Sequence, residues 1–293
     1  MQKNLLSGAH LNDETAAYEH LASIRWPDGI HCVHCQGTKI YRLKGAKSKR
    51  VLLKCSTCRK QFSATVGTIF QGSHIPLTKW FMAFQLLASS KKGMSAHQLH
   101  RQLGMTYKSA WFMAHRIRHV MKQTPFGDKL GGIVEADETY IGGKSHTRGL
   151  GSDKKTPVFA LVERGGRVRS FTMPRVTAVN LKRSIQEHVS PEAKLMTDEL
   201  IAYAKIGKDF ADHQTVIHSK KEYVRGTAST NTVEGYFSLL KRGLTGTYHH
   251  VSARHLHRYL DEFNFRYNAR KEDDATRNFL AVKRTEGKRL LYR

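Results

Sequence analysis

Two Cys-x-x-Cys pairs near the start of the chain constrain its fold more than any other feature. Cys32 and Cys35 form the first pair, Cys55 and Cys58 form the second, and nineteen residues separate the two pairs. Each pair can turn tightly enough for two thiolates to grip one ion, and this spacing is typical of a structural zinc ribbon. We therefore expect one structural Zn²⁺ per chain. The neighbouring His31 and His34 are substitute ligands, and four free thiols are the alternative interpretation.

The charge of the chain points to an anionic partner. The 293 residues include 49 Lys and Arg against 24 Asp and Glu, a formal net charge of +25. A folded protein this basic repels itself unless an anion such as nucleic acid lies nearby. Composition alone is compatible both with a ribosomal or chromatin-like protein and with a DNA-processing enzyme.

The chain has no predicted membrane segment. No run of about 18 apolar residues occurs, as a membrane span would need, and Met1 to Asn12 lack the apolar core of a signal peptide. We expect a cytoplasmic protein with no membrane partner. In a reducing cytosol, the clustering of all four cysteines also favours a metal site over disulfides.

Residues 73–124 are predicted to be helical, after a zinc ribbon over 1–72. Trp80 and Phe84 recur at helical spacing, Ser95 with Gln98 has the form of a capping box, and Gly104 ends a short helix. Thr106 can cap a third helix. The pattern predicts a helix-turn-helix suited to the DNA major groove, and a plain helical linker bundle is the alternative. Its outward face is predicted to carry Lys108, Ser109, His115, Arg116 and His119, and we expect Lys108 and Arg116 to contact DNA.

A break at Thr124-Pro125-Phe126-Gly127, followed by Gly131-Gly132, predicts a domain boundary. From residue 131 to about 271 the pattern changes to strands and helices in the order β-β-β-α-β-α-β-α, which predicts a mixed α/β domain. The predicted strands are 133–141, 158–162, 167–173, 194–197 and 214–218, and the clearest predicted helices are 177–189, 232–244 and 253–267. Residues 272–293 are predicted to be a basic tail.

Three carboxylates lie on elements that the predicted strand and helix order brings together. Asp137 lies in the first strand, where alternation puts it on the same face as Glu135 and opposite to Glu138. Asp198 ends the strand 194–197, and Glu234 lies near the start of a helix. Carboxylates on two strands and a helix could hold two hard cations, which clamp the attacking and leaving oxygens of a phosphodiester. Magnesium is the expected ion, with manganese as a substitute, because both prefer oxygen ligands.

Each carboxylate also has a structural interpretation without a metal. Asp137 could be a surface acid beside a hairpin, and Asp198 could cap a helix that begins at Glu199. Asn231-x-x-Glu234 has the form of a capping box, in which Glu234 would fold back onto the cap amide.

A basic surface accompanies the carboxylates. Lys241 lies two helical turns after Glu234, where it could touch a DNA phosphate beside the metal site. We name the predicted surface the basic track; its members are Lys241, Arg242, Arg254, Arg258, Arg266 and Arg270, with Tyr248, His249 and His250 between them. A solvated charged face is the alternative interpretation.

Taken together, these residues resemble bacterial insertion-sequence transposases of the DDE class that carry an N-terminal zinc ribbon, the ISXO-like type. The resemblance covers nearly the whole chain. Its motifs are Trp26-Pro27-Asp28-Gly29, Phe62-Ser63, Gly67-Thr68-Ile69-Phe70, Ala110-Trp111, Asp137-Glu138-Thr139-Tyr140-Ile141-Gly142-Gly143-Lys144, the block from Thr230-Asn231 through Glu234-Gly235 to Lys241-Arg242, and Phe265-Arg266-Tyr267-Asn268.

The resemblance implies a ribonuclease H-like α/β fold, a mixed sheet with flanking helices, behind the zinc ribbon and helix-turn-helix. It implies that Asp137 and Asp198 are metal ligands, and Asn231 and Glu234 are both candidates for the third. We favour Glu234, because a carboxylate compensates cation charge.

Such an enzyme would bind the terminal inverted repeats of its element and catalyse strand cleavage and strand transfer. Its partners would be the element ends and target DNA, with at least two copies of the chain. A non-catalytic DNA-binding regulator and a nuclease of the same fold are the alternatives.

Overall fold

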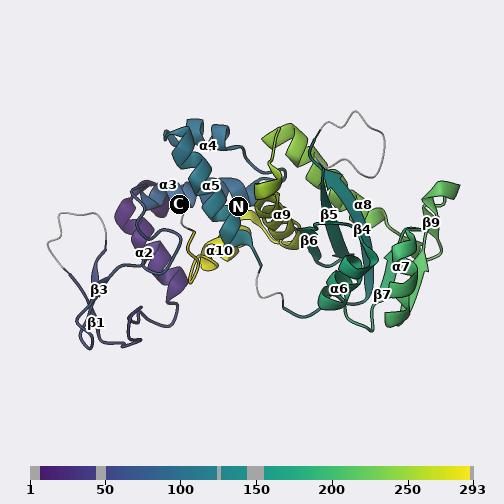
Figure 1. Cartoon of the computed structure of the whole chain (residues 1–293). Coiled ribbons are helices and arrows are strands. Elements are labelled where there is room, and N and C mark those ends of the chain that lie inside the picture. The colour runs from purple at the N-terminus through teal and green to yellow at the C-terminus, as the bar shows by residue number, and fades with distance from the viewer. Residues whose placement is uncertain (1–6, 44–50, 124–126, 144–154, 291–293) are drawn as a thin grey trace. The chain divides into compact units, whose positions relative to one another are not determined.

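The computed structural model describes residues 7–43, 51–123, 127–143 and 155–290. Within it the chain forms two compact units (Figure 1). Unit 1 comprises Met1–Met121 together with Glu272–Arg293, and unit 2 comprises Lys122–Lys271. Thr124 to Phe126, in the predicted boundary, and Lys144, in the transposase motif, lie outside the described residues. Among the described residues, no helix combines the length and hydrophobicity that crossing a bilayer needs.

Unit 1 contains six helices and a small sheet among its described residues. Its elements are α1 (Ala9–Asn12), α2 (Glu14–Arg25), β1 (Ile40–Arg42), β2 (Leu53–Cys55), β3 (Gln61–Phe62), α3 (Leu77–Ser89), α4 (Ala96–Leu103), α5 (Tyr107–Met121) and α10 (Asp274–Lys283). The three strands are antiparallel in the order β1-β2-β3, and Tyr41 pairs with Lys54. The sheet therefore joins the two cysteine pairs, as the spacing predicts.

The predicted caps of α4 and α5 form in unit 1. Ser95 accepts a hydrogen bond from the backbone N–H of Gln98, 3.2 Å away, and Thr106 accepts one from the N–H of Ser109, also 3.2 Å away. Gly104 follows α4 with φ +55°, a left-handed conformation that glycine adopts without strain. These local signals produce two short helices joined by a tight turn.

Helix α10 lies in the segment for which the sequence predicts a basic tail. Ala281 and Val282 are buried, and the helix packs against α2, α3 and α5. Helix α10 thus packs in the same core as α2 and α3, which lie far earlier in the sequence.

Unit 2 is a mixed sheet between two layers of helices. Its elements are β4 (Ile133–Ile141), β5 (Thr156–Glu163), β6 (Val168–Thr172), α6 (Ala178–His188), β7 (Lys194–Thr197), α7 (Ile201–Ile206), η1 (Gly207–Asp209), β8 (Asp212–Thr215), η2 (His218–Lys220), β9 (Val224–Arg225), β10 (Ala228–Ser229), α8 (Asn231–Gly243), the π-helical turn η3 (Leu244–Tyr248) and α9 (Ala253–Asn268). The large sheet has the order β6-β5-β4-β7-β8, antiparallel up to β4 and parallel beyond it.

This sheet confirms the predicted ribonuclease H-like α/β domain. Helices α6 and α7 cover one face, where Val134 and Ala136 of β4 join the core. Helices α8 and α9 cover the other face, against Val158, Ala160 and Val162 of β5 (Figure 1). The strand from 214 to 218 begins earlier than predicted, at Asp212, and a hairpin, β9–β10, that the sequence does not predict precedes α8.

Candidate active site and metal centres

Strand β4 presents two acidic side chains to the α8 side of the sheet. Glu135 pairs with Val162 and Asp137 with Ala160 of β5, and both partners belong to the core beneath α8 and α9. Glu138 points to the opposite face, where it accepts a hydrogen bond from the buried Tyr203 hydroxyl, 2.6 Å away. The predicted alternation along β4 is therefore confirmed.

Asp198 directly follows β7, the strand that pairs in parallel with β4. Glu135 of β4 pairs with Met196 of β7, so Asp137 lies two residues further along β4 and Asp198 lies one residue beyond the end of β7. Adjacent strands lie about 4.8 Å apart, so both side chains emerge at one edge of the sheet. Asp198 Oδ1 accepts the Leu200 N–H at 3.0 Å, and the following helix begins at Ile201 rather than at Glu199.

Helix α8 brings Glu234 and Lys241 to Asp137. All three line an open cleft of about 430 Å³; the rest of its lining is Glu138, Thr139, Phe237, Ser238 and Arg242. Lys241 and Arg242 are exposed, and Glu234 is on the first turn of the helix. Asn231 is exposed and is the first residue of α8, and neither it nor Asp198 lines this cleft.

Burial and neighbouring carboxylates raise the pKa values of two residues of the candidate site. Burial, followed by the charge of Glu138, raises the pKa of Asp137 to about 8, and the charges of Asp198 and Glu234 add to this rise. Burial also raises the pKa of Asp198, as does the neighbouring charge of Glu199. With its pKa at about 8, Asp137 holds its proton at neutral pH unless a cation lies beside it. Within the described residues, however, no three of these carboxylates approach one another as closely as the four cysteines do.

The start of α8 differs from the predicted capping box. Asn231 is not the cap: Thr230 precedes the helix, and its hydroxyl donates to Glu234 Oε1 at 2.8 Å. The same oxygen lies 3.4 Å from Nε2 of His218, so Glu234 does turn toward the helix start, but its side chain is 45% exposed. Both contacts use Oε1.

Glu135 provides the cap that Asn231 does not. Its fully buried carboxylate accepts the N–H groups of Thr232 and Val233 through Oε2, at 2.7 and 2.9 Å, and the Thr232 hydroxyl through Oε1 at 2.9 Å. Arg164 Nε donates to Glu135 Oε1 at 2.6 Å. The sequence put Glu135 on the correct face, but its partners come from distant segments and gave no local signal.

Arg164 ties the same helix to the β9–β10 hairpin. Its Nη1 donates to the Thr227 carbonyl at 2.8 Å, and its Nη2 donates to the carbonyl and hydroxyl of Ser229 at 3.1 and 2.7 Å. The strand that carries Asp137 and the helix that carries Glu234 are thus joined by one partly buried ionic network.

His218, which the sequence did not single out, lies beside Glu234. Its Nε2 forms a hydrogen bond with the Thr230 hydroxyl, 3.1 Å away. The backbone N–H groups of Ser219 and His218 donate to the carboxylate of Glu199, the residue after Asp198, and lower the pKa of Glu199 to about 2.

Only some residues of the basic track are exposed. Arg254, Arg270, His249 and His250 are exposed like Lys241 and Arg242, and Arg258 and Tyr248 are half-buried. The prediction that Arg266 lies on the basic surface was wrong. Arg266 is 5% exposed, and its guanidinium pairs with buried Glu262. An i, i+4 spacing allows this pair within α9.

Helix α5 carries the residues predicted to face DNA. Lys108 is exposed, and Arg116 is half-buried with Nη1 3.4 Å from the Ile69 carbonyl. The expected outward orientation of His115 was wrong, because the residue is fully buried with its ring 4.1 Å from that of Trp111. Helix α5 packs against α3, α4 and α10, so more of its surface is covered than a three-helix cluster would cover.

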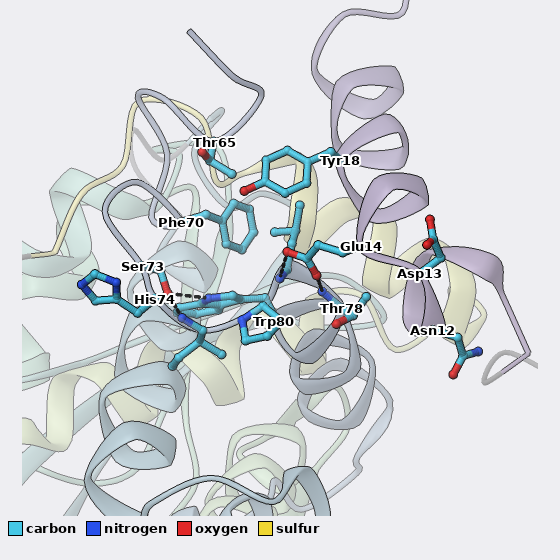
Figure 2. Close-up of a pocket in the computed structure, with 13 residues that line it drawn as sticks. Asn12, Asp13, Glu14, Tyr18, Thr65, Phe70, Ser73, His74, Thr78 and Trp80 are labelled. Atoms are coloured by element: carbon cyan, nitrogen blue, oxygen red, sulfur yellow. Dashed lines mark hydrogen bonds between the residues drawn. The ribbon is translucent and has the colours of Figure 1, made fainter. Parts of the chain in front are cut away.

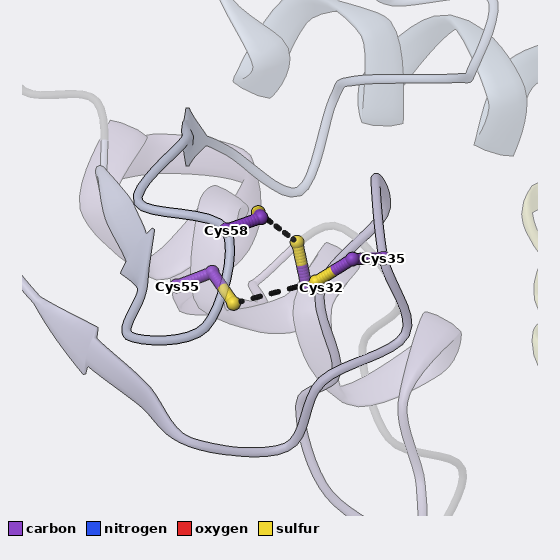
Figure 3. Close-up of side chains that lie close together, drawn as sticks. All are labelled: Cys32, Cys35, Cys55 and Cys58. Carbon is purple, nitrogen blue, oxygen red and sulfur yellow. Dashed lines mark hydrogen bonds between the residues drawn. The ribbon is translucent and has the colours of Figure 1, made fainter.

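The four cysteines converge in unit 1 (Figure 3). The Sγ atoms of Cys32 and Cys58 lie 3.6 Å apart, as do those of Cys35 and Cys55, and all four are within 4.8 Å of one another. Zn–S bonds of about 2.3 Å in a tetrahedron imply an S···S separation of about 3.8 Å. Backbone N–H groups, first that of Cys58, lower the pKa of Cys55 to about 6 and favour the thiolate. The site fits Zn²⁺.

A cavity of about 420 Å³ in unit 1 has a structural explanation (Figure 2). Glu14 reaches across it and accepts the N–H groups of Leu77 and Thr78 at 2.8 and 3.2 Å, which caps α3. Trp80 Nε1 donates to the Ser73 hydroxyl at 3.1 Å. Because the helix start already has its carboxylate, it offers no open anion site.

Known proteins match both units. Residues 129–268 match the ISXO2-like transposase domain, and residues 12–61 match the transposase zinc-ribbon domain. An uncharacterized protein in transposable element ISH50 of Halobacterium salinarum is 28% identical over 272 residues, which cover 86% of this chain and 90% of the relative.

Two solved structures are weakly similar. The Mos1 strand transfer complex has a TM-score of 0.29 at 13% identity, over 69% of this chain and 73% of the other. A pre-cleavage Mos1 transpososome has a TM-score of 0.26 at 11% identity, over 69% and 74%. The strand order and the two domain matches, which together span most of the chain, carry the assignment. The chain thus contains an ISXO2-like transposase domain over residues 129–268, preceded by a transposase zinc-ribbon domain over residues 12–61.

Proposed function

We propose that this transposase binds the terminal inverted repeats of its own element and hydrolyses one DNA strand at each end. The freed 3′-hydroxyl would then attack a target phosphodiester. One observation supports this most strongly: Asp137 lies on β4, Asp198 directly follows the adjacent parallel strand β7, and the charges of Asp198 and Glu234 both act on Asp137. Two DNA ends must meet for this reaction, so at least two copies of the chain would act together.

Asp137, Asp198 and Glu234 would hold Mg²⁺, or Mn²⁺ in its place. The donor set fits, because every ligand is a carboxylate oxygen and a bound cation would offset the repulsion that raises the pKa of Asp137. When bound, these cations activate the attacking oxygen and stabilise the leaving oxygen. Glu234 would contribute the oxygen that does not contact Thr230 and His218.

The chain's own basic residues would position the DNA. Lys241 and Arg242 line the cleft with Asp137, so a phosphate held by them would lie beside the carboxylates. Lys108 and Arg116 of α5 would contact the inverted repeat. Asn231 would not be a ligand, because a neutral amide compensates no cation charge.

Single alanine variants test these assignments. Asp198→Ala should reduce cleavage and joining more than a hundredfold, since metal activation supplies several kcal/mol and about 1.4 kcal/mol is tenfold in rate. It should leave binding to the element end nearly intact. Glu234→Ala should match it, and Asn231→Ala should stay active. An active Glu234→Ala beside an inactive Asn231→Ala would reverse the choice of third ligand, and a fully active Asp198→Ala would overturn the mechanism.

A further inference from the structure

The segment between β8 and α8 exposes an aromatic ring among basic residues. We call residues 218–229 the arm. Tyr223 is 55% exposed, and Val224 beside it is also exposed. Lys220, Lys221 and Arg225 lie within three residues of Tyr223 and are exposed as well, and Glu222 among them pairs with Arg225 at 3.7 Å. Large apolar side chains exposed together often mark a contact with another molecule.

The base of the arm is fixed to unit 2. Ala228 is buried in a cluster with Met196 of β7 and Val216. Arg225 Nη2 donates to the Thr215 carbonyl at 2.7 Å, and Arg164 binds the Thr227 and Ser229 carbonyls. The tip of the arm is therefore presented from a rigid base.

The arm also lies beside the candidate catalytic carboxylates. Glu199, directly after Asp198, accepts the His218 and Ser219 N–H groups at 2.8 and 2.9 Å. His218 Nε2 lies 3.4 Å from Glu234 Oε1, and its ring centroid lies 5.3 Å from that of Tyr223. One imidazole ring thus separates Tyr223 from Glu234.

The chemistry of the arm suits an unpaired nucleotide. An exposed aromatic face flanked by lysines is how proteins stack a base while holding its phosphates. The apolar part is two side chains, too small for a stable protein interface. Paired bases keep their faces inside the duplex, so only an unpaired base could stack on Tyr223.

We propose that the arm binds an unpaired nucleotide of the DNA strand next to the scissile phosphodiester. Its base stacks on Tyr223, and Lys220 and Lys221 bind the adjoining phosphates. This inference rests on the proposed function, because the site beside Glu234 must be where DNA is cut.

Cross-linking tests the contact directly. A single-stranded decanucleotide carrying one 5-iodouracil is irradiated with the full-length protein, without added divalent metal, and the cross-linked peptides are mapped. The arm peptide should be cross-linked. The yield there should fall about tenfold in Tyr223→Ala, as expected for the loss of one stacked base, and persist in Tyr223→Phe. Phe279→Ala removes a comparably exposed ring, 43%, from unit 1 and should change nothing.

Binding measurements separate stacking from charge. Fluorescence anisotropy should give a weaker single-strand affinity for Tyr223→Ala with an unchanged salt slope, whereas Lys220→Ala with Lys221→Ala should lower the slope. Wild-type arm cross-links that survive Tyr223→Ala, or that form equally with the paired duplex, would overturn the inference. So would a Tyr223→Ala protein that changes only its oligomeric state. Strand joining without arm cross-links leaves the proposed function intact, and arm cross-links without cleavage or joining would contradict that function instead.

Discussion

Replacing Glu135 with alanine should destabilise unit 2 more than any surface change. Its fully buried carboxylate caps α8 through two N–H groups and pairs with Arg164. Removing one partner of a buried pair costs about 3–5 kcal/mol, because the remaining charge loses its compensation. The Arg164 side chain is 26% exposed, and water can solvate it in part, so we expect a loss of roughly 3 kcal/mol.

Glu135→Gln should cost less than Glu135→Ala. The amide oxygen can still accept from one group, and the loss is then about that of a charged hydrogen bond, 1.5–3 kcal/mol. Asp209→Ala is the matched control, because its pair with Lys182 at 2.9 Å is largely exposed. Exposed pairs are worth about 0–1 kcal/mol.

Hydrogen exchange by mass spectrometry can assign the loss to the correct unit. Amides at the start of α8 should lose protection in Glu135→Ala. The three tryptophans, Trp26, Trp80 and Trp111, all lie in unit 1, so their fluorescence on denaturation should shift little. A stability loss in Glu135→Ala no larger than in Asp209→Ala would refute this account of the network.

Three further predictions concern the metals and DNA. Natively purified protein should hold one zinc per chain by native mass spectrometry, and Cys55→Ser should lose it; a zinc-free wild type would contradict the ribbon. Replacing Lys108 and Arg116 with alanine should weaken binding to the element end and flatten its salt dependence, and unchanged affinity would remove them from the interface. The pKa of Asp137 is raised from 3.8 to about 8, chiefly by burial, so the metal-free protein should lose stability as pH rises between these values. Binding of Mn²⁺ by calorimetry should correspondingly strengthen up to about pH 8, and Asp137→Asn should weaken both the binding and its pH dependence.

The sequence predicted the features that depend on local periodicity. Alternation in β4 separates Asp137 from Glu138, and a two-turn spacing puts Glu234 and Lys241 on one face of α8. The cysteine spacing predicted the ribbon in the same way.

The sequence did not predict features that depend on partners far away in the chain. Glu135 caps α8 from a strand almost a hundred residues earlier in the chain, so the sequence around Asn231 suggested a cap that does not form. His115 is buried on α5, a helix that packs against α3, α4 and the distant α10. Arg266 is the exception, since its partner Glu262 lies one turn away and could have been recognised.

Strand joining by the wild-type protein tests the central claim most directly. Labelled DNA ending in the inverted repeat that flanks the coding region is incubated with the protein, Mg²⁺ and a target plasmid, and the products are sequenced. We predict cleavage at the repeat end and covalent joining of its 3′-hydroxyl to the plasmid. Cleavage without joining would identify a nuclease, and repeat binding with neither reaction would identify a non-catalytic regulator; either result would contradict the proposed activity.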